Sequence, residues 1–248
     1  MNEEKSFMID AEETPRQPFN LDESHITDTT PDPQLMLAWL ESPDYQQRMS
    51  ATRAFCELQF PLAVPYLIRL LQDNCPLIRV SAAYALGRNP SPTAIEPLIH
   101  QLESDLNGYV RKGIVWALGN CCDSRCLPPL LDALKTDIAA VRLWAASSIG
   151  QVASIGYDAI IHVMPAVILG LRRDSVPVVR SNCAWSVGQL CRELPSNVVY
   201  ATAVDALIEA LVEDEDVGVQ EDARASLLRL GDPRALQIIE ELEQEGFF

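Results

Sequence analysis

An arginine followed eight residues later by a glycine recurs four times along this chain at nearly constant spacing. The segment 77–87, LIRVSAAYALG, closely resembles the segment 109–119, YVRKGIVWALG. Further copies lie at 142–150 and 180–188, with a degenerate copy at 220–228 and a weaker one around Arg48. Successive copies are 31, 32, 31, 38 and 40 residues apart. A period of this length indicates a solenoid of stacked repeats, which is more often a binding surface than a reaction vessel.

Each copy is expected to be the second helix of a helical hairpin. The first helices are expected to open near a proline, whose missing N–H is harmless in a first turn, at Pro65, Pro97, Pro129 and Pro165. The turn between the two helices carries an aspartate, at Asp73, Asp105, Asp137, Asp174 and Asp214. We expect this aspartate to cap the second helix and the arginine to pair with a turn aspartate, including that of an adjacent repeat. Charges that repeat with the fold favour a structural role over a catalytic one.

The turn aspartate, the Val-Arg or Ile-Arg pair, the alanine-rich second helix and its closing Leu-Gly resemble the short form of the HEAT repeat over about residues 33–236. Such short repeats are typical of the phycobilin-lyase-like HEAT proteins of cyanobacteria. The whole chain also resembles cyanobacterial HEAT-repeat proteins that partner the A-type iron–sulfur scaffold. The resemblance implies an all-α solenoid of about six helical hairpins over residues 33–248. Residues 1–32 are acidic and lack periodicity, so we expect a disordered tail there.

Composition narrows the class of partner. The formal net charge is -16, and the excess acids lie at the two ends: residues 1–32 hold nine acids and two bases, and residues 205–248 hold thirteen acids and three bases. Without a basic stripe for phosphates, we expect no nucleic-acid binding. No apolar run is long enough to span a membrane, and the start lacks a secretory pattern. Seven cysteines at irregular spacing predict reduced thiols and a cytoplasmic protein.

Helical periodicity separates two faces of each second helix. Four positions of each copy share an apolar core face: the residue before the arginine and the residues three, six and seven after it. The residues four and eight after the arginine are small and allow close stacking of repeats. Residues one, two, five and nine after the arginine are expected on the concave face, where tryptophans recur. Large aromatics anchor protein interfaces, although packing against inserts or the tail would also explain them. The predicted partner-binding residues are Tyr84, Arg88, Lys112, Trp116, Asn120, Trp144, Asn182, Trp185 and Gln189.

Three cysteines lie within six residues, at Cys121, Cys122 and Cys126, in a turn between repeats. Thiolates are ligands for soft metals and iron–sulfur clusters. No second cysteine pair at ligand spacing accompanies them, so a complete site would need a remote residue or a partner. The alternative is a set of unligated thiols in a loop.

Little in the sequence predicts catalysis. The His-Glu pairs that hold the di-iron centre of deoxyhypusine hydroxylase, another HEAT protein, are absent: Gln101 follows His100, and Val163 follows His162. We therefore predict a non-catalytic adaptor that holds a protein in its concave groove. The narrower resemblance implies an iron–sulfur assembly protein as that partner, with a cluster shared between the two chains. The alternative is a bilin-lyase-like subunit or phycobilisome factor whose aromatic groove stacks a linear tetrapyrrole, with Arg88 or Lys112 on its propionates.

Overall fold

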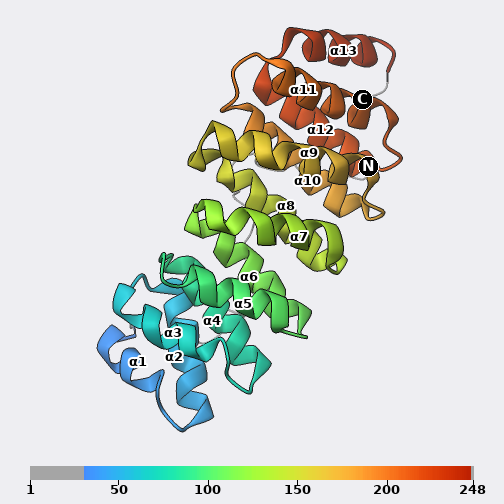
Figure 1. Cartoon of the computed structure of the whole chain (residues 1–248). Helices are drawn as coiled ribbons and strands as arrows, with labels where there is room; N and C mark the ends of the chain where they lie inside the picture. Colours follow the sequence, from blue (N-terminus) through green and yellow to red (C-terminus); the bar gives the residue numbers. More distant parts are fainter. Residues whose placement is uncertain (1–30, 247–248) are drawn as a thin grey trace, which may run out of the picture. The chain divides into compact units, whose positions relative to one another are not determined.

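The computed structural model describes residues 31–246, which contain thirteen α-helices and no strand (Figure 1). Asp32 caps the first helix by accepting from the backbone N–H of Gln34. The predicted disordered tail falls almost wholly on residues 1–30, which lie outside the described residues. The helices are α1 (Pro33–Trp39), α2 (Tyr45–Glu57), α3 (Val64–Leu70), α4 (Pro76–Arg88), α5 (Ile95–Ser104), α6 (Gly108–Cys121), α7 (Leu127–Thr136), α8 (Ala139–Gln151), α9 (Tyr157–Arg173), α10 (Pro177–Cys191), α11 (Val198–Glu213), α12 (Val217–Leu230) and α13 (Pro233–Gln244).

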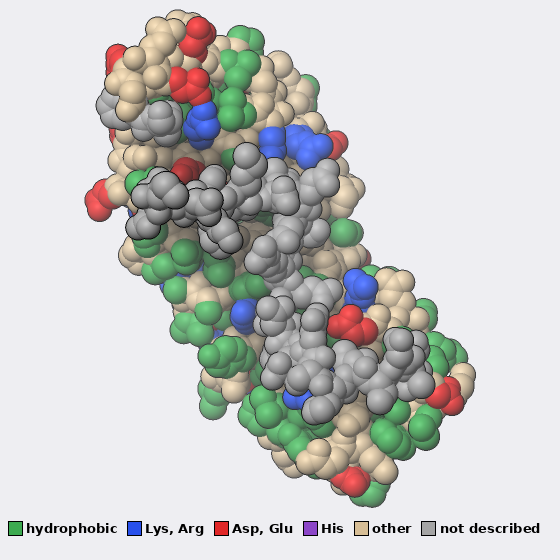
Figure 2. Space-filling view, turned by 180° about the vertical axis from the view of Figure 1, so that it is seen from behind, with side chains coloured by type: hydrophobic (Ala, Val, Ile, Leu, Met, Phe, Trp, Pro, Cys, Tyr) green, Lys and Arg blue, Asp and Glu red, His purple; other side chains and the backbone are tan. Residues whose placement is uncertain are grey.

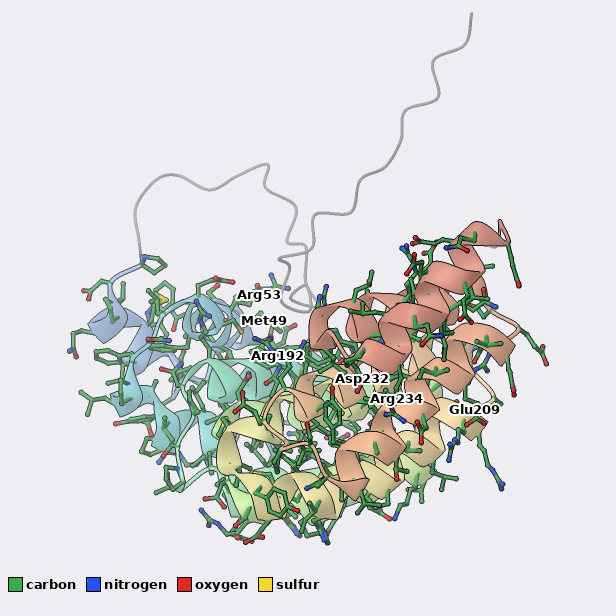
Figure 3. The ribbon with its side chains drawn as sticks, turned by 90° about the horizontal axis from the view of Figure 1, so that it is seen from above. Met49, Arg53, Arg192, Glu209, Asp232 and Arg234 are labelled. Carbon is green, nitrogen blue, oxygen red and sulfur yellow. The ribbon has the colours of Figure 1, made fainter. Side chains whose placement is uncertain are left out.

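The helices pair into six consecutive hairpins, α1/α2 to α11/α12, and α13 packs against the last pair. This confirms the predicted all-α solenoid of about six hairpins. Each second helix packs along its length on the next, in the series α2, α4, α6, α8, α10 and α12, whereas neighbouring first helices pack much less closely. Tighter packing on one side bends such a stack toward that side. The second helices accordingly line the inner side of the curve that the described helices follow in Figure 3.

The expected core face is confirmed in each clear repeat. Ile78, Ala82, Ala85 and Leu86 are fully buried in α4, and their counterparts are fully buried in α6. The apolar side chains of first and second helices meet there in a single hydrophobic core. This face therefore holds the hairpins together, and the opposite face of each second helix remains for other contacts.

A ladder of charge pairs joins successive repeats along the turns, as the sequence predicts. Arg79 binds Asp105 of the next repeat through two hydrogen bonds, with Nε 2.7 Å from Oδ2 and Nη2 3.1 Å from Oδ1. Its Nη1 also donates to the carbonyl oxygen of Asp73 in its own repeat at 3.0 Å. Equivalent arginine–aspartate pairs are Arg48–Asp73, Arg111–Asp137, Arg142–Asp174 and Arg180–Asp214. Each arginine thus ties its own turn to the following repeat.

The ladder ends at the last hairpin. Gln220 replaces the arginine and still donates to the carbonyl oxygen of Asp214 at 2.7 Å. Within the described residues α12 is followed by the single helix α13, and Gln220 makes no contact with a turn aspartate of a further repeat. The degenerate copy is therefore a cap: it keeps the hydrogen bond to the carbonyl of its own turn and lacks the ion pair that joins one repeat to the next.

Two expectations about the repeats are wrong in detail. The turn aspartate does not cap the second helix. Asp105, for example, accepts from the backbone N–H of Asn107 and folds the turn, while Asn107 is the cap of α6. Pro165 does not open its helix either: it lies inside α9, because the insert near residues 154–158 lets that helix start earlier, at Tyr157. The inserts therefore lengthen first helices and leave the ladder intact.

Candidate functional site

Two tryptophans of the concave face are positioned by glycines of the preceding repeat. A side chain at Gly87 would collide with the ring of Trp116, and a Cβ at Gly150 would lie 2.7 Å from the Trp185 ring. Only a glycine leaves room for these rings, which lie partly buried against the neighbouring helix. The predicted role of these glycines in close stacking is confirmed. The rings are held by the repeats themselves and not by an insert.

An aromatic and cationic cluster lies on the second helices α4, α6 and α8. The rings of Tyr84 and Trp116 are 5.4 Å apart between centroids and tilted by 55°. The Nζ atom of Lys112 lies over the ring of Trp144, 5.1 Å from its centroid, in a cation–π contact. Burial lowers the pKa of Lys112 and raises that of Tyr84, because a partly dry environment disfavours the charged form of each.

Not every residue of the expected concave column faces the groove. Tyr84 is only 8% exposed, and Val80 and Ser147 are buried as well. The reason is that adjacent second helices pack over these positions. Trp116, Trp144 and Trp185 remain partly exposed, as do the predicted polar residues Arg88, Lys112, Asn120, Asn182 and Gln189.

Hydrogen bonds fix part of this polar set. Asn182 accepts from the Ser147 hydroxyl and donates to the carbonyl oxygen of Val178 at 2.9 Å. Gln189 accepts weakly from Arg192, at 3.5 Å. The Nε atom of Arg88 is buried and has no hydrogen-bond partner among the described residues. The amides are therefore held in place, whereas the Arg88 guanidinium retains an unused donor.

Two further bases lie on this side and were not predicted from the sequence, Arg53 and Arg192, which Figure 3 labels. Arg53 follows Arg48 by five residues, as Tyr84 follows Arg79, so extending the column to the weak first repeat would have found it. Arg192 lies just beyond the end of α10, where helical counting gives no expectation. Both side chains are exposed.

The three-cysteine turn does not gather its thiols at one point. Cys121 ends α6, Cys122 follows it with a left-handed backbone (φ 48°), and its exposed thiol points to the carbonyl oxygen of Gly119. Cys126 is buried. A hydrogen bond between Cys121 and Cys126 lowers the pKa of Cys121 and raises that of Cys126. Within residues 31–246, no group of three or more His, Cys, Asp or Glu is arranged to hold a metal ion.

Two cavities lie on the side of the first helices, away from the tryptophans. The larger, about 920 Å³, lies between α5 and α7 and is lined by Ile99, Leu102 and Pro129 together with the acids Glu103 and Asp132. The smaller, about 410 Å³, lies beside Arg172 and Glu209, which form an ion pair. Neither combines stacking aromatics with free bases. Among the described helices, none is both long and apolar enough to cross a membrane.

Comparison with known families agrees with this geometry. The family model for HEAT repeats matches residues 33–113, 95–163 and 164–246. This chain belongs to the HEAT-repeat family. Among solved structures, the chain is similar to an engineered protein (TM-score 0.58, 20% identity, covering 81% of this chain and 97% of that one).

Two other similar structures are a designed peptide complex and a natural protein. A designed armadillo repeat protein in complex with the peptide (KR)4 has a TM-score of 0.57 and 21% identity, and the alignment covers 80% of this chain and 98% of that one. Yeast importin-beta has a TM-score of 0.58 and 21% identity, with 85% of this chain and 33% of that chain covered. At this level of identity, the similarity shows the fold of the HEAT-repeat chain and nothing finer.

Proposed function

We propose that this HEAT-repeat protein is a non-catalytic scaffold that holds a protein partner in the groove lined by its second helices. The observation that carries the proposal is the row of partly exposed rings, Trp116, Trp144 and Trp185, on the inner side of the stack. Large rings on a solvated face bury much apolar surface when a partner covers them. The fold supports the proposal, since repeat solenoids are typical protein-binding scaffolds.

The rings are also suited to binding because they are held before a partner arrives. Trp116 and Trp185 lie against the glycines of the preceding repeat, and Trp144 lies under Lys112. A side chain that is already fixed loses little conformational entropy on binding, so more of its contact energy becomes affinity. This geometry favours the three tryptophans as anchors over the exposed but unsupported side chains of the turns.

An iron–sulfur assembly protein remains the proposed identity of the partner, from the resemblance of the whole chain. The Cys121–Cys126 turn supports this only in part, because Cys121 and Cys126 lie together while Cys122 points elsewhere. A cluster at this turn would therefore draw its remaining ligands from the partner. A cytoplasmic location accords with the reduced thiols and stays part of this proposal.

The test is affinity capture with the tagged full chain under anaerobic conditions, comparing Trp144→Ala with Trp39→Ala. Trp144 and Trp39 are both partly buried tryptophans that pack against the core, and Trp39 lies on the first helix α1, so the two truncations are matched in kind. We expect Trp144→Ala to lose the captured partner and Trp39→Ala to keep it, with both variants folded and similarly destabilised. Equal capture by both variants would contradict the groove assignment.

A bilin-lyase-like role is the second candidate, and one observation favours it. Arg88 and Lys112 have no carboxylate partner among the described residues, so either could bind a propionate. Titration of the protein with a linear tetrapyrrole separates the candidates. A shifted and intensified visible band that is lost in Lys112→Gln would support the bilin role, and an unchanged spectrum would count against it.

A further inference from the structure

The charges of the second helices divide into two groups. Five arginines belong to the ladder and pair with turn aspartates. The other bases on or just after α2, α4, α6, α8 and α10 have no ion pair with any described residue; these groove bases are Arg53, Arg88, Lys112 and Arg192. Unpaired cations on a surface are ordinary when scattered. Here all four lie on or just after the second helices of one stack, and Lys112 contacts the Trp144 ring.

Acids are nearly absent from the same helices. On or just after α2, α4, α6, α8 and α10 the groove bases outnumber the acids: Glu57 is the only acid within these helices, and Glu193 follows Arg192 after α10, in a protein whose formal net charge is -16. The next second helix, α12, differs: it carries Glu221 and Asp222, and Asp222 accepts from the hydroxyl of Ser181. The groove is therefore basic from α2 to α10 and acidic at its α12 end. Figure 2 shows both basic and acidic side chains at several levels of the stack, so the assignment rests on the helices that carry them.

The groove bases are placed to act on a ligand and not on the fold. Arg53 and Arg192 project from opposite parts of the described helices on the inner side of the curve in Figure 3. Arg88 has its buried Nε donor unused, and Lys112 sits above the Trp144 ring. The Arg88 side chain as a whole is partly exposed, so its charge is within reach of a carboxylate even though the Nε atom is not.

We propose that the groove from α2 to α10 binds an acidic peptide segment of a partner protein, with carboxylates on the groove bases and apolar side chains on the tryptophans. This inference rests on the proposed function and specifies its partner. Its physical basis is charge complementarity, which sets the specificity of an interface more than its raw affinity. The designed armadillo protein that is similar in fold was solved with the basic peptide (KR)4. The groove of this chain has the opposite preference.

The test measures binding of labelled synthetic peptides to the full chain by fluorescence anisotropy. The acidic probe is the peptide Glu-Glu-Phe repeated four times. Its neutral control has Gln in place of Glu, and (KR)4 is the basic control. We expect the acidic peptide to bind about tenfold or more tighter than the neutral one, and (KR)4 to bind more weakly than either. The neutral peptide should still depend on Trp144.

Charge reversal locates the site. Arg53→Glu combined with Arg192→Glu should weaken the acidic peptide about tenfold or more and leave the neutral peptide unchanged. The matched control is Arg173→Glu, an exposed arginine at the end of the first helix α9 that has no ion pair within the described residues. It should leave both affinities unchanged, and every variant should melt like the parent.

The outcomes separate this inference from the proposed function. Equal affinity for acidic and neutral peptides, with both lost in Trp144→Ala, would overturn the acidic preference and leave the scaffold role standing. Failure of both peptides to bind would overturn the inference. The scaffold role would then still be decided by the affinity capture that compares Trp144→Ala with Trp39→Ala. Tighter binding of a short single-stranded oligonucleotide than of the acidic peptide would also overturn it in favour of a nucleic-acid ligand.

Discussion

Arginines of the second helices have opposite roles in two regions: along the turns, which we call the turn edge, and in the groove. At the turn edge, Arg79 and its equivalents are saturated: each binds an aspartate of the next repeat and a carbonyl of its own. In the groove, Arg53 and Arg88 lie on the same helices without an ion pair within the described residues. The difference separates charges that hold the fold together from charges that remain available to a partner.

Periodicity distinguishes the two groups in the sequence itself. The ladder arginines recur once per repeat at the same helical position, as a contact required by every repeat must. Counted from the ladder arginine of its own repeat, each groove base lies at a different distance: one, five, nine or twelve residues. A residue that does not repeat with the fold is not required by it. This is why Arg53 and Arg192 are candidates for function despite having no role in the stack.

Acidification should break four steps of the ladder together and gives the largest expected effect. Burial works against ionisation of Asp105, Asp137, Asp174 and Asp214, but hydrogen bonds from their arginines and from turn N–H groups prevail and lower each pKa. A carboxyl whose pKa is lower in the folded than in the unfolded state stabilises the fold above the unfolded value, about 3.9. That stability is lost as the pH falls below it. Urea unfolding at stepwise pH should show a steep loss of unfolding free energy below about pH 4.

The matched variant Asp105→Asn tests the origin of this loss. It removes one titrating carboxylate in advance, so its unfolding free energy should be lower at neutral pH and should fall less steeply below pH 4. A variant with the same acid slope as the parent would show that the slope comes from other carboxylates.

Breaking a single ladder step gives the next largest effect. The Asp105 side chain is 1% exposed, and Asp105→Ala would leave the Arg79 guanidinium without its carboxylate and the Asn107 N–H without its acceptor. We expect the unfolding free energy to fall by about 3–5 kcal/mol, as for other pairs broken on one side. Glu41→Ala is the control: its pair with Arg69 is 58% and 59% exposed, so the loss should stay below about 1 kcal/mol. Similar losses for both would mean that the ladder is no stronger than a surface pair.

The ladder was predictable from sequence because its residues recur with the period of the repeats. Periodicity describes each helix separately, so it did not predict how neighbouring helices cover one another. The recurrence of Arg79 and Asp105 gave the hairpins, the core face and the contact between repeats. Helical counting placed Tyr84 in the groove, but the packing of α4 on α6 covers it, and such packing cannot be read from one helix. The Gly87–Trp116 contact needed both repeats in space.

Filling the space beneath a groove tryptophan should have a moderate effect. Gly87→Ala places a methyl group against the Trp116 ring, and overpacking of this kind costs about 1–3 kcal/mol. The higher helix propensity of alanine offsets this by about 1 kcal/mol, so we expect a net loss near the lower end of the range. In a Trp116→Ala background the loss should shrink but need not vanish, because the same methyl group would lie 3.0 Å from the Cα atom of Ala117. An equal loss in both backgrounds, measured by urea unfolding, would show that the ring is not the obstacle.

Removing groove bases should affect stability least of all. Arg53→Gln breaks no ion pair among the described residues, and Arg88→Met removes a buried donor that has no acceptor. We expect the unfolding free energy to change by less than about 0.5 kcal/mol for Arg53→Gln, and to stay level or rise slightly for Arg88→Met. Arg79→Gln, one of the ladder arginines, should by contrast destabilise strongly. If Arg88→Met destabilised the protein as much as Arg79→Gln, Arg88 would belong with the charges that build the stack. The distinction between paired and available arginines would then fail for Arg88, the groove base with a buried and unpartnered donor.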